Sequence, residues 1–441
     1  MARGSIPAAR AGRRRVLLLG AAVAALVVAA IAAIGPRLPM ARHLRAAREA
    51  LGRGDMLAAL RSLETADRLR PGRAEVQYLL AVAKRRAGRI DESAVHLQRA
   101  QDLGWPSADV QRQRWLATAQ GGDVPAVKRE LMEAIERGVP DDVAEEIYEA
   151  VAKGHMAAYR LRDAWMCLDV WLQWRPDAPH ARMMRASIFE QTGDLDQAVD
   201  DYRAVLETWP EHRDAQIRLG QVLLRKRAYD EARDVFHARV DVAPEDAEAL
   251  LGLAQSERWL GNDAEAKRLA EAAMALGLSP RHQGLALEEL GRALLKEGKH
   301  EEAIAALTQA TALAPGEGLI HHALGMALAR AGRTEEALAH QERLRRIQAE
   351  YDRMTQITRN LMDRPLSAEL RCEAGSILTE QGLKKEGADW LLTALCCDPS
   401  HRKSHQLLAE YYAEAGNQSQ AAHHRLMAAQ APQRQPPAKP K

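Results

Sequence analysis

The sequence predicts an all-α protein, a solenoid of about eleven helix-turn-helix repeats preceded by one transmembrane helix, and three observations carry this prediction. First, the helix-favouring residues Ala, Leu, Glu and Arg dominate the 441-residue chain, whereas only 8 Trp, 8 Tyr and 2 Phe are present. Second, residues 16–35 form an uncharged apolar segment. Third, a pattern of small and apolar residues recurs from residue 40 onward with a period of 34.

The N-terminal part of the chain has the properties of a membrane anchor. Residues 1–15 form a basic tail with five arginines and no acidic residue. Residues 16–35 then form an apolar segment that Pro36 ends, and a helix of this length spans a hydrocarbon core of about 30 Å. We expect an uncleaved transmembrane helix, because the apolar region of a cleaved signal peptide usually has about 7–15 residues. A signal peptide cut near the small residues at 30–32 is the alternative.

The arginines around this segment favour one orientation only slightly. Five arginines precede it, and five more follow it within about twenty residues. The positive-inside rule therefore weakly favours an N-terminus inside the cell and a repeat array on the extracytoplasmic, periplasmic side. The opposite orientation stays open. The high content of Ala and Arg is a compositional feature typical of bacterial proteins.

The 34-residue pattern is clearest in residues 213–246. Earlier copies in the same frame end at Pro210 and Pro176. Each copy is expected to form two antiparallel helices, because a glycine permits the turn between them and the proline ends the second helix. Two helices cannot bury their apolar faces alone, so neighbouring copies must stack. The residues that define the clearest copy are Leu219, Gly220, Leu223, Tyr229, Ala232, Phe236 and Pro244.

These residues resemble the tetratricopeptide repeat family, which has a small pair in the first helix, Ala-x3-aromatic in the second helix and a closing proline. The resemblance implies a right-handed superhelix whose first helices line the concave face. It extends over nine repeats in residues 40–351 and two more in residues 368–430, with short breaks at 142–144 and 281–283. The insertion 352–367 either lengthens the second helix of the ninth repeat or forms a hinge. The Pro- and Gln-rich tail 431–441 is expected to be disordered.

Charge and motif patterns argue against several classes of function. Subtracting the eight basic residues of the two ends from the net charge of +2 leaves about −6 for residues 16–430. This balance does not suit a nucleic-acid-binding surface, which needs clustered positive charge. The sequence has no recognisable phosphate-binding glycine loop or nucleophile motif. We therefore expect neither an enzyme nor a cofactor nor a small-molecule substrate.

The histidines and cysteines show no metal-binding spacing. The pairs His321-His322 and His423-His424 are adjacent, and neighbouring residues of a helix point about 100° apart. We expect these histidines, with His401 and His405, to be solvent-facing polar residues. The four cysteines lack the CxxC spacing of a zinc site, and we expect them to be reduced. A disulfide between Cys372 and Cys396, on opposite helices of one repeat, stays open.

The resemblance also supplies candidate binding residues. Projecting the family's concave positions onto repeats six to nine gives a basic, amide-bearing stripe, which suits an acidic or extended segment of a protein partner. A solvated helix face is the alternative. The Lys and Asn positions with which some family members clamp a C-terminal carboxylate are absent, so that mode of recognition is not expected. The candidate residues are Gln221, Arg225, Gln255, Arg258, Trp259, Arg292, Lys296, Met326 and Arg330.

Two functions follow from these expectations. The first is a membrane-anchored scaffold for protein–protein interaction in bacterial envelope assembly or export, with the membrane contacted through one helix. The second is an adaptor that regulates an enzyme of envelope lipid or polysaccharide biosynthesis. Adaptors that resemble this chain carry a C-terminal metal knuckle built from two CxxC pairs, which this sequence lacks.

Overall fold

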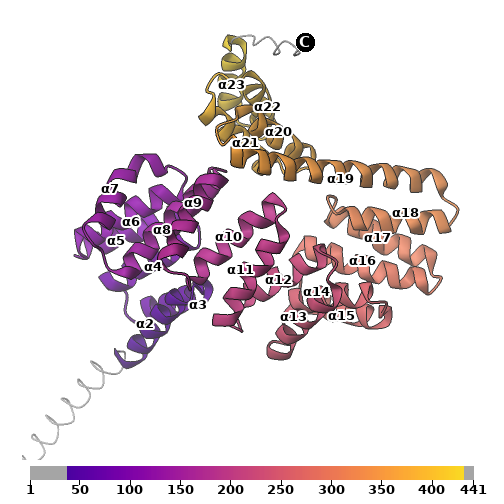
Figure 1. The fold of residues 1–441 in the computed structure, drawn as a ribbon, viewed down its shortest axis with the longest axis horizontal. Helices are drawn as coiled ribbons and strands as arrows, with labels where there is room; N and C mark the ends of the chain where they lie inside the picture. Colours follow the sequence, from indigo (N-terminus) through magenta and orange to yellow (C-terminus); the bar gives the residue numbers. More distant parts are fainter. Residues whose placement is uncertain (1–36, 432–441) are drawn as a thin grey trace, which may run out of the picture. The chain divides into compact units, whose positions relative to one another are not determined.

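The computed structural model describes residues 37–431, which form 22 α-helices and no strand (Figure 1). The prediction of an all-helical protein is confirmed for this part of the chain. It divides into two compact units, of which unit 1 ends at Gly154 and unit 2 begins at His155. The helices that begin in unit 1 are α2(Arg37–Gly52), α3(Met56–Leu69), α4(Ala74–Arg86), α5(Ile90–Asp102), α6(Ser107–Gln120), α7(Val124–Glu136) and α8(Asp141–Ala157).

Unit 2 continues with fifteen helices in seven successive pairs after α9. They are α9(Leu161–Trp174), α10(Pro179–Thr192), α11(Leu195–Thr208), α12(Arg213–Arg225), α13(Tyr229–Val242), α14(Ala247–Trp259), α15(Asp263–Leu276), α16(Pro280–Lys296), α17(His300–Leu313), α18(Gly318–Arg330), α19(Thr334–Asp363), α20(Ala368–Glu380), α21(Lys384–Cys397), α22(Arg402–Glu414) and α23(Gln418–Gln430).

From residue 37 to residue 431, no helix combines the length and the apolar character needed to cross a membrane. The predicted anchor at 16–35 lies outside the described residues, as does the predicted tail after residue 431.

Glycines let the first helices of neighbouring repeats approach a shared aromatic ring. Phe236 is buried between α12 and α14, and a Cβ atom on Gly220 or Gly252 would lie only 2.4 or 2.3 Å from the Cζ atom of its ring. Gly291 makes the same kind of close approach to Leu307. The small residues of the repeat pattern therefore have a steric cause, because any side chain at these positions would overlap the buried ring or branched chain.

At several repeat boundaries, the turn is held by a side chain six residues after its proline. Gln216 donates a hydrogen bond to the carbonyl oxygen of Pro210 over 2.9 Å. His321 bonds to the carbonyl of Pro315 over 3.1 Å, and His405 and Arg371 make the equivalent bonds to Pro399 and Pro365. A carbonyl oxygen left free at a helix end needs such a partner.

This arrangement corrects the expectation that the histidines face solvent. His321, His405 and His424 are buried, and His322 and His423 are exposed. His321 and His405 are buried because each supplies the hydrogen bond to the turn carbonyl and a second bond to a histidine of the next helix, His340 or His424. Period analysis places a residue in a helix, but it does not reveal a polar contact to the preceding turn.

Each break in the 34-residue period appears as an elongated helix. Between α3 and α23, most helices have 13 or 14 residues, whereas α8 and α16 have 17 and α19 has 30. The extra residues of α16 lie at its N-terminus, where Ser279 caps the helix. In α19 the extension continues through residues 352–363 and ends before Pro365.

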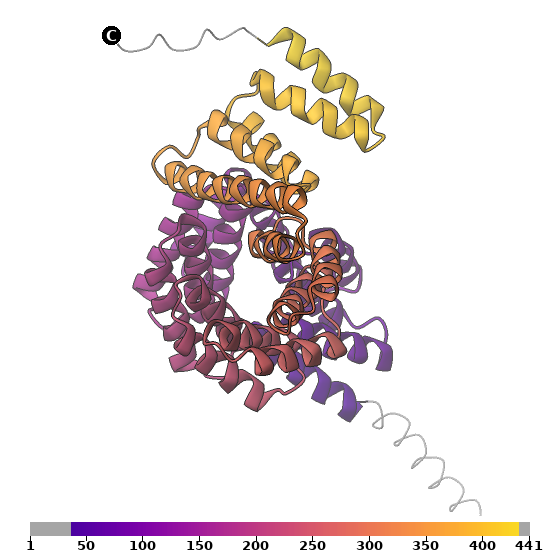
Figure 2. The same ribbon diagram turned by 90° about the vertical axis from the view of Figure 1, so that its right-hand side faces the viewer.

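The extension of α19 returns to the start of unit 2 (Figure 2). The Thr358 hydroxyl donates to the carbonyl oxygen of Gln191 over 2.7 Å, and Arg359 donates to the carbonyl of Thr192 over 2.8 Å. Ile357 and Leu361 are fully buried beside Tyr159. We call these four residues of α19 (Ile357, Thr358, Arg359 and Leu361) the α19 closure. It joins α19 to α9 and α10, so the row of helices in unit 2 closes on itself.

Candidate binding face

The first helices of consecutive repeats lie side by side in unit 2. Helix α12 packs on α14, α14 on α16, and α16 on α18. We call the surface formed by α10, α12, α14, α16 and α18 the first-helix face. All nine candidate residues lie on four of these helices, α12, α14, α16 and α18.

Three of the four arginines of the predicted stripe already have carboxylate partners within the chain. The Nε atom of Arg258 lies 2.7 Å from Glu289, and the Nε atom of Arg292 lies 2.7 Å from Glu288. Both glutamates are almost completely buried. Arg225 pairs with Glu190 at 3.4 Å. These three arginines therefore contact acidic residues that the sequence analysis did not identify.

Other contacts hold the ends of these helices. Arg225 also donates to the hydroxyl of Tyr351 on α19, and Lys296 pairs with Asp263. Arg330 donates to the carbonyl oxygen of Leu295 over 3.2 Å. These bonds run between neighbouring repeats or to the α19 helix, so the long basic side chains hold the array together as well as facing solvent.

One glutamate of the buried acidic pair has a raised pKa. Burial, together with the adjacent charge of Glu288, raises the pKa of Glu289 to about 8, and Arg258 acts in the opposite direction. A sequence signal for this pair existed, since two adjacent glutamates lie inside α16 between the apolar residues Leu287 and Leu290. Without the neighbouring helices, however, the arginines that face them were not predictable.

Four candidate residues are not engaged by hydrogen bonds or ion pairs within the described part of the chain. They are Gln221, Gln255, Trp259 and Met326. Trp259 is 43% exposed, and its ring stacks on Tyr229 with 5.1 Å between centroids. The guanidinium of Arg258 lies 4.2 Å from the centre of the same indole ring. An exposed indole fixed on two sides is a pre-ordered surface for contact.

A pocket of about 460 Å³ opens on this face. Its walls come from the first helices α10, α12, α14 and α16 and from Tyr202 of the second helix α11. Ser187 and Gln221 lie on it at equivalent positions of two repeats. The extra turn of α16 contributes Arg281 and His282, so the break in the repeat period shapes the pocket. Arg218 also lines it, with an exposed side chain that pairs with no carboxylate of residues 37–431.

A smaller pocket of about 360 Å³ shares a wall with the first. Arg213 forms this wall and is held by Asp246 at 2.8 and 2.9 Å and by Glu248 at 2.9 Å. These carboxylates raise the pKa of Arg213, and Arg213 and Arg239 lower the pKa of the buried Asp246 against the effect of burial. The wall is therefore a fixed ion-pair cluster.

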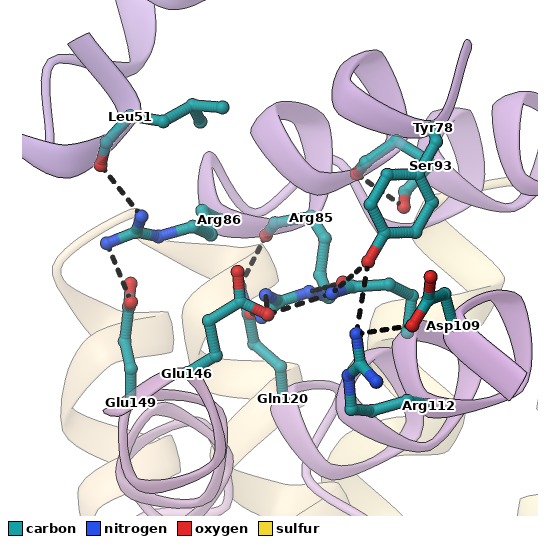
Figure 3. Close-up of polar contacts among 12 residues, drawn as sticks. Leu51, Tyr78, Arg85, Arg86, Ser93, Asp109, Arg112, Gln120, Glu146 and Glu149 are labelled. Atoms are coloured by element: carbon teal, nitrogen blue, oxygen red, sulfur yellow. Dashed lines mark hydrogen bonds and ion pairs between the residues drawn. The ribbon is translucent and has the colours of Figure 1, made fainter. Parts of the chain in front are cut away.

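Unit 1 contains a separate polar network that the sequence analysis did not predict (Figure 3). Arg85 is fully buried, and its guanidinium donates to Gln113 over 2.8 Å and to Gln120 over 3.0 Å. Burial lowers the pKa of Arg85, while Glu146 and Glu149 oppose this shift. Arg86 donates to the Leu51 carbonyl and pairs with Glu149 at 2.8 Å. Because these bonds tie α4 to α2, α6 and α8, the network braces unit 1.

No group of three His, Cys, Asp or Glu side chains within residues 37–431 is arranged to hold a metal ion. The four cysteines, including Cys372 and Cys396, are free thiols. Burial raises the pKa of Cys372 and raises that of Cys167 to about 12. These two thiols are therefore poor nucleophiles at neutral pH.

Comparison with known proteins gives a consistent result for the family. A family model described as "Tetratricopeptide repeat" matches residues 44–108, 142–211, 183–239 and 288–352. Small glutamine-rich tetratricopeptide repeat-containing protein 2 of Mycosarcoma maydis is 32% identical over 104 residues. That match covers 22% of this chain and only 30% of the curated relative.

Several solved structures are also similar. A tetratricopeptide repeat protein from Parabacteroides merdae is 16% identical, with a TM-score of 0.35, over 73% of this chain and 99% of that one. The Cut9–Hcn1 assembly of the APC/C is 15% identical, with a TM-score of 0.34, over 90% of this chain and 82% of that one. The MamA protein is 21% identical, with a TM-score of 0.30, over 39% of this chain and 92% of that one.

Proposed function

The chain belongs to the tetratricopeptide repeat family, and from this premise we propose that it holds a partner protein on the first-helix face of unit 2. The observation that carries the proposal is the 460 Å³ pocket, which four consecutive first-helix elements build together. The unengaged Gln221 lines this pocket, and the unengaged Gln255 and the exposed Trp259 lie on α14, one of the helices that form it. Aromatic and amide side chains of this kind are typical of interaction surfaces. The proposed role is that of a binding protein and not of an enzyme.

The proposal extends to the location of the chain. The uncharged segment 16–35 supports a single N-terminal membrane helix, and the lean of the flanking arginines supports a repeat array on the periplasmic side. With that orientation the partner is a component of bacterial envelope assembly or an exported polypeptide.

The alternative is a cytoplasmic adaptor that regulates an enzyme of envelope lipid or polysaccharide biosynthesis. The two functions require opposite orientations of the array. A membrane-impermeant thiol reagent distinguishes them in intact cells, because Cys396 is an exposed thiol on α21. Labelling after permeabilisation of the outer membrane alone supports the periplasmic orientation, and labelling only after cell lysis supports the adaptor. A Cys396→Ser variant gives the background.

Filling the pocket tests the binding face. Crosslinked full-length protein is purified from its own membranes, and the recovered partners are identified by mass spectrometry. Ser187→Trp introduces a large side chain into the pocket, whereas Gln197→Trp adds the same side chain at an exposed site of α11. We expect the first change to remove the partner and the second to retain it. Equal recovery with both variants would show that the partner binds elsewhere.

A further inference from the structure

We propose that the first-helix face recognises an extended polypeptide through its main chain, with Gln221 and Gln255 as the hydrogen-bonding groups. This inference rests on the proposed function and specifies the chemistry of the partner. The bound segment is an uncharged stretch whose peptide groups pair with the two amides, and its side-chain sequence matters less than its extended conformation.

The first argument is the state of the two amides. Gln221 and Gln255 are half-buried, and neither is hydrogen-bonded to any other residue of the described range 37–431. Other glutamines are engaged, as Gln113 and Gln120 are with Arg85 in unit 1 and Gln216 is with Pro210. A side-chain amide offers two donors and one acceptor, which match the N–H and C=O groups of a peptide.

The second argument is their position. The two glutamines are 34 residues apart and occupy the same place on α12 and α14, which pack on each other. Packed helices have axes about 8–10 Å apart, and an extended chain advances about 3.3 Å per residue. Two equivalent amides on neighbouring helices can therefore meet peptide groups about three residues apart. Ser187 continues the row on α10 and lines the pocket together with Gln221.

The third argument is the electrostatic balance of the face. Arg258 and Arg292 are each bound to a buried glutamate, Glu289 or Glu288. An acidic ligand that drew these arginines away would leave a buried glutamate side chain without its hydrogen-bond partner, which is unfavourable. The guanidinium groups of Arg258 and Arg292 are therefore already engaged within the chain and are not free to bind an acidic ligand. Trp259, one turn beyond Gln255, adds an exposed apolar surface that accepts many side chains.

Arg218 provides the competing explanation. Its exposed guanidinium lines the same pocket without a carboxylate partner among residues 37–431, so a charged ligand would bind there. Different variants abolish the two modes of recognition. Gln221→Ala with Gln255→Ala should abolish binding through the main chain, and Arg218→Ala should abolish binding of an acidic side chain.

The experiment uses the full-length chain in detergent and an array of random 12-residue peptides with different net charges. The best binder is remade with each main-chain amide N-methylated in turn, which removes one donor without changing a side chain. We expect uncharged binders, and a loss of affinity of about tenfold on N-methylation at positions about three residues apart. The Gln221→Ala, Gln255→Ala variant should bind the parent peptide about tenfold more weakly and no longer respond to those methyl groups.

Two controls make the result specific. Gln197→Ala with Gln309→Ala removes two exposed amides from the second helices α11 and α17 and should leave binding unchanged. Acidic binders that are lost with Arg218→Ala and kept by the Gln221→Ala, Gln255→Ala variant would overturn the inference. Binders that Ser187→Trp excludes but the double glutamine variant retains would overturn it and leave the proposed binding face intact. An array without any binder would contradict both.

Discussion

His321 and His405 occupy the same position of two repeats and make the same two contacts. The Nε2 atom of each bonds to a proline carbonyl, so it carries a proton in either charge state. The Nδ1 atom of each then lies 2.9 Å from the Nδ1 atom of His340 or His424. One of the two facing nitrogens must accept, so each pair tolerates at most one positive charge. These four residues form two hydrogen-bonded histidine pairs, each of which connects the two helices of its repeat.

The two histidine pairs predict that the free energy of unfolding decreases in acid. Burial lowers the pKa values of His321, His340 and His424. The unfolded chain then binds more protons than the folded chain, so the free energy of unfolding should fall as the pH drops from about 7 to 5. The change His321→Gln with His405→Gln should flatten this dependence by on the order of 1 kcal/mol. Urea unfolding of the wild type and this variant at several pH values measures the difference.

Glutamine is a suitable replacement because the chain already uses it in this way. Gln216 makes the same bond to a proline carbonyl, and Gln77 accepts the Nδ1 contact of His96 over 2.8 Å. An unchanged pH slope in the double variant would mean that other groups dominate the acid sensitivity of the chain.

At the level of single residues, the sequence predicts features that recur with the repeat period. It does not predict which side chains of neighbouring repeats contact each other. The small site at Gly220 was predictable, because it recurs in the pattern and the buried Phe236 ring requires it. The nine candidate residues lie on first helices for the same reason, because the repeat frame specifies the helix of each position. The partners of Arg258 and Arg292 were not predictable. They depend on which side chains of adjacent helices meet, and the repeat frame does not specify this.

At the level of helices, the elongated elements give the array its irregular features. In a regular array each repeat packs against its neighbours, and the helices of all repeats end at equivalent positions. The four early residues of α16 bring Arg281 and His282 to the pocket, and the long α19 reaches two helices far back in the chain. The sequence indicated where the period breaks, but the direction of the added turns follows from packing that only the structure shows.

The packing of Phe236 between two helices predicts a steep penalty for a single methyl group. A Cβ atom on Gly252 would lie 2.3 Å from the ring, so Gly252→Ala should lower the free energy of unfolding by about 1–3 kcal/mol or more. Gly316→Ala serves as the control, since its Cβ would have no atom within 4 Å. Thermal unfolding followed by circular dichroism compares the two. If Phe236→Leu relieves the penalty in the double variant, the overlap with the ring is its cause.

At the level of the whole unit, the α19 closure changes how stability is distributed. In an open solenoid each repeat contacts only its neighbours, so a mutation weakens the repeats next to it. In unit 2 the hydrogen bonds of Thr358 and Arg359 to Gln191 and Thr192 connect elements 167 residues apart in the sequence. Helices α9 and α10 therefore contact α19 as well as the helices next to them in the sequence. We expect local unfolding of α19 to be coupled to local unfolding of α9 and α10.

Leu361→Ala tests this coupling, because Leu361 is completely buried in the closure whereas Leu338, on the same helix, is 58% exposed. Removing a buried leucine side chain typically destabilises by about 2–5 kcal/mol, and Leu338→Ala should have little effect. Hydrogen exchange should then accelerate in α9 and α10 as well as in α19 and α20, while α13 and α14 keep their protection. If faster exchange stays confined to α18–α20, unit 2 behaves as an open array and the closure is a contact without energetic weight. If it reaches α9 and α10, the closed row is the cooperative unit that holds the first-helix face in shape.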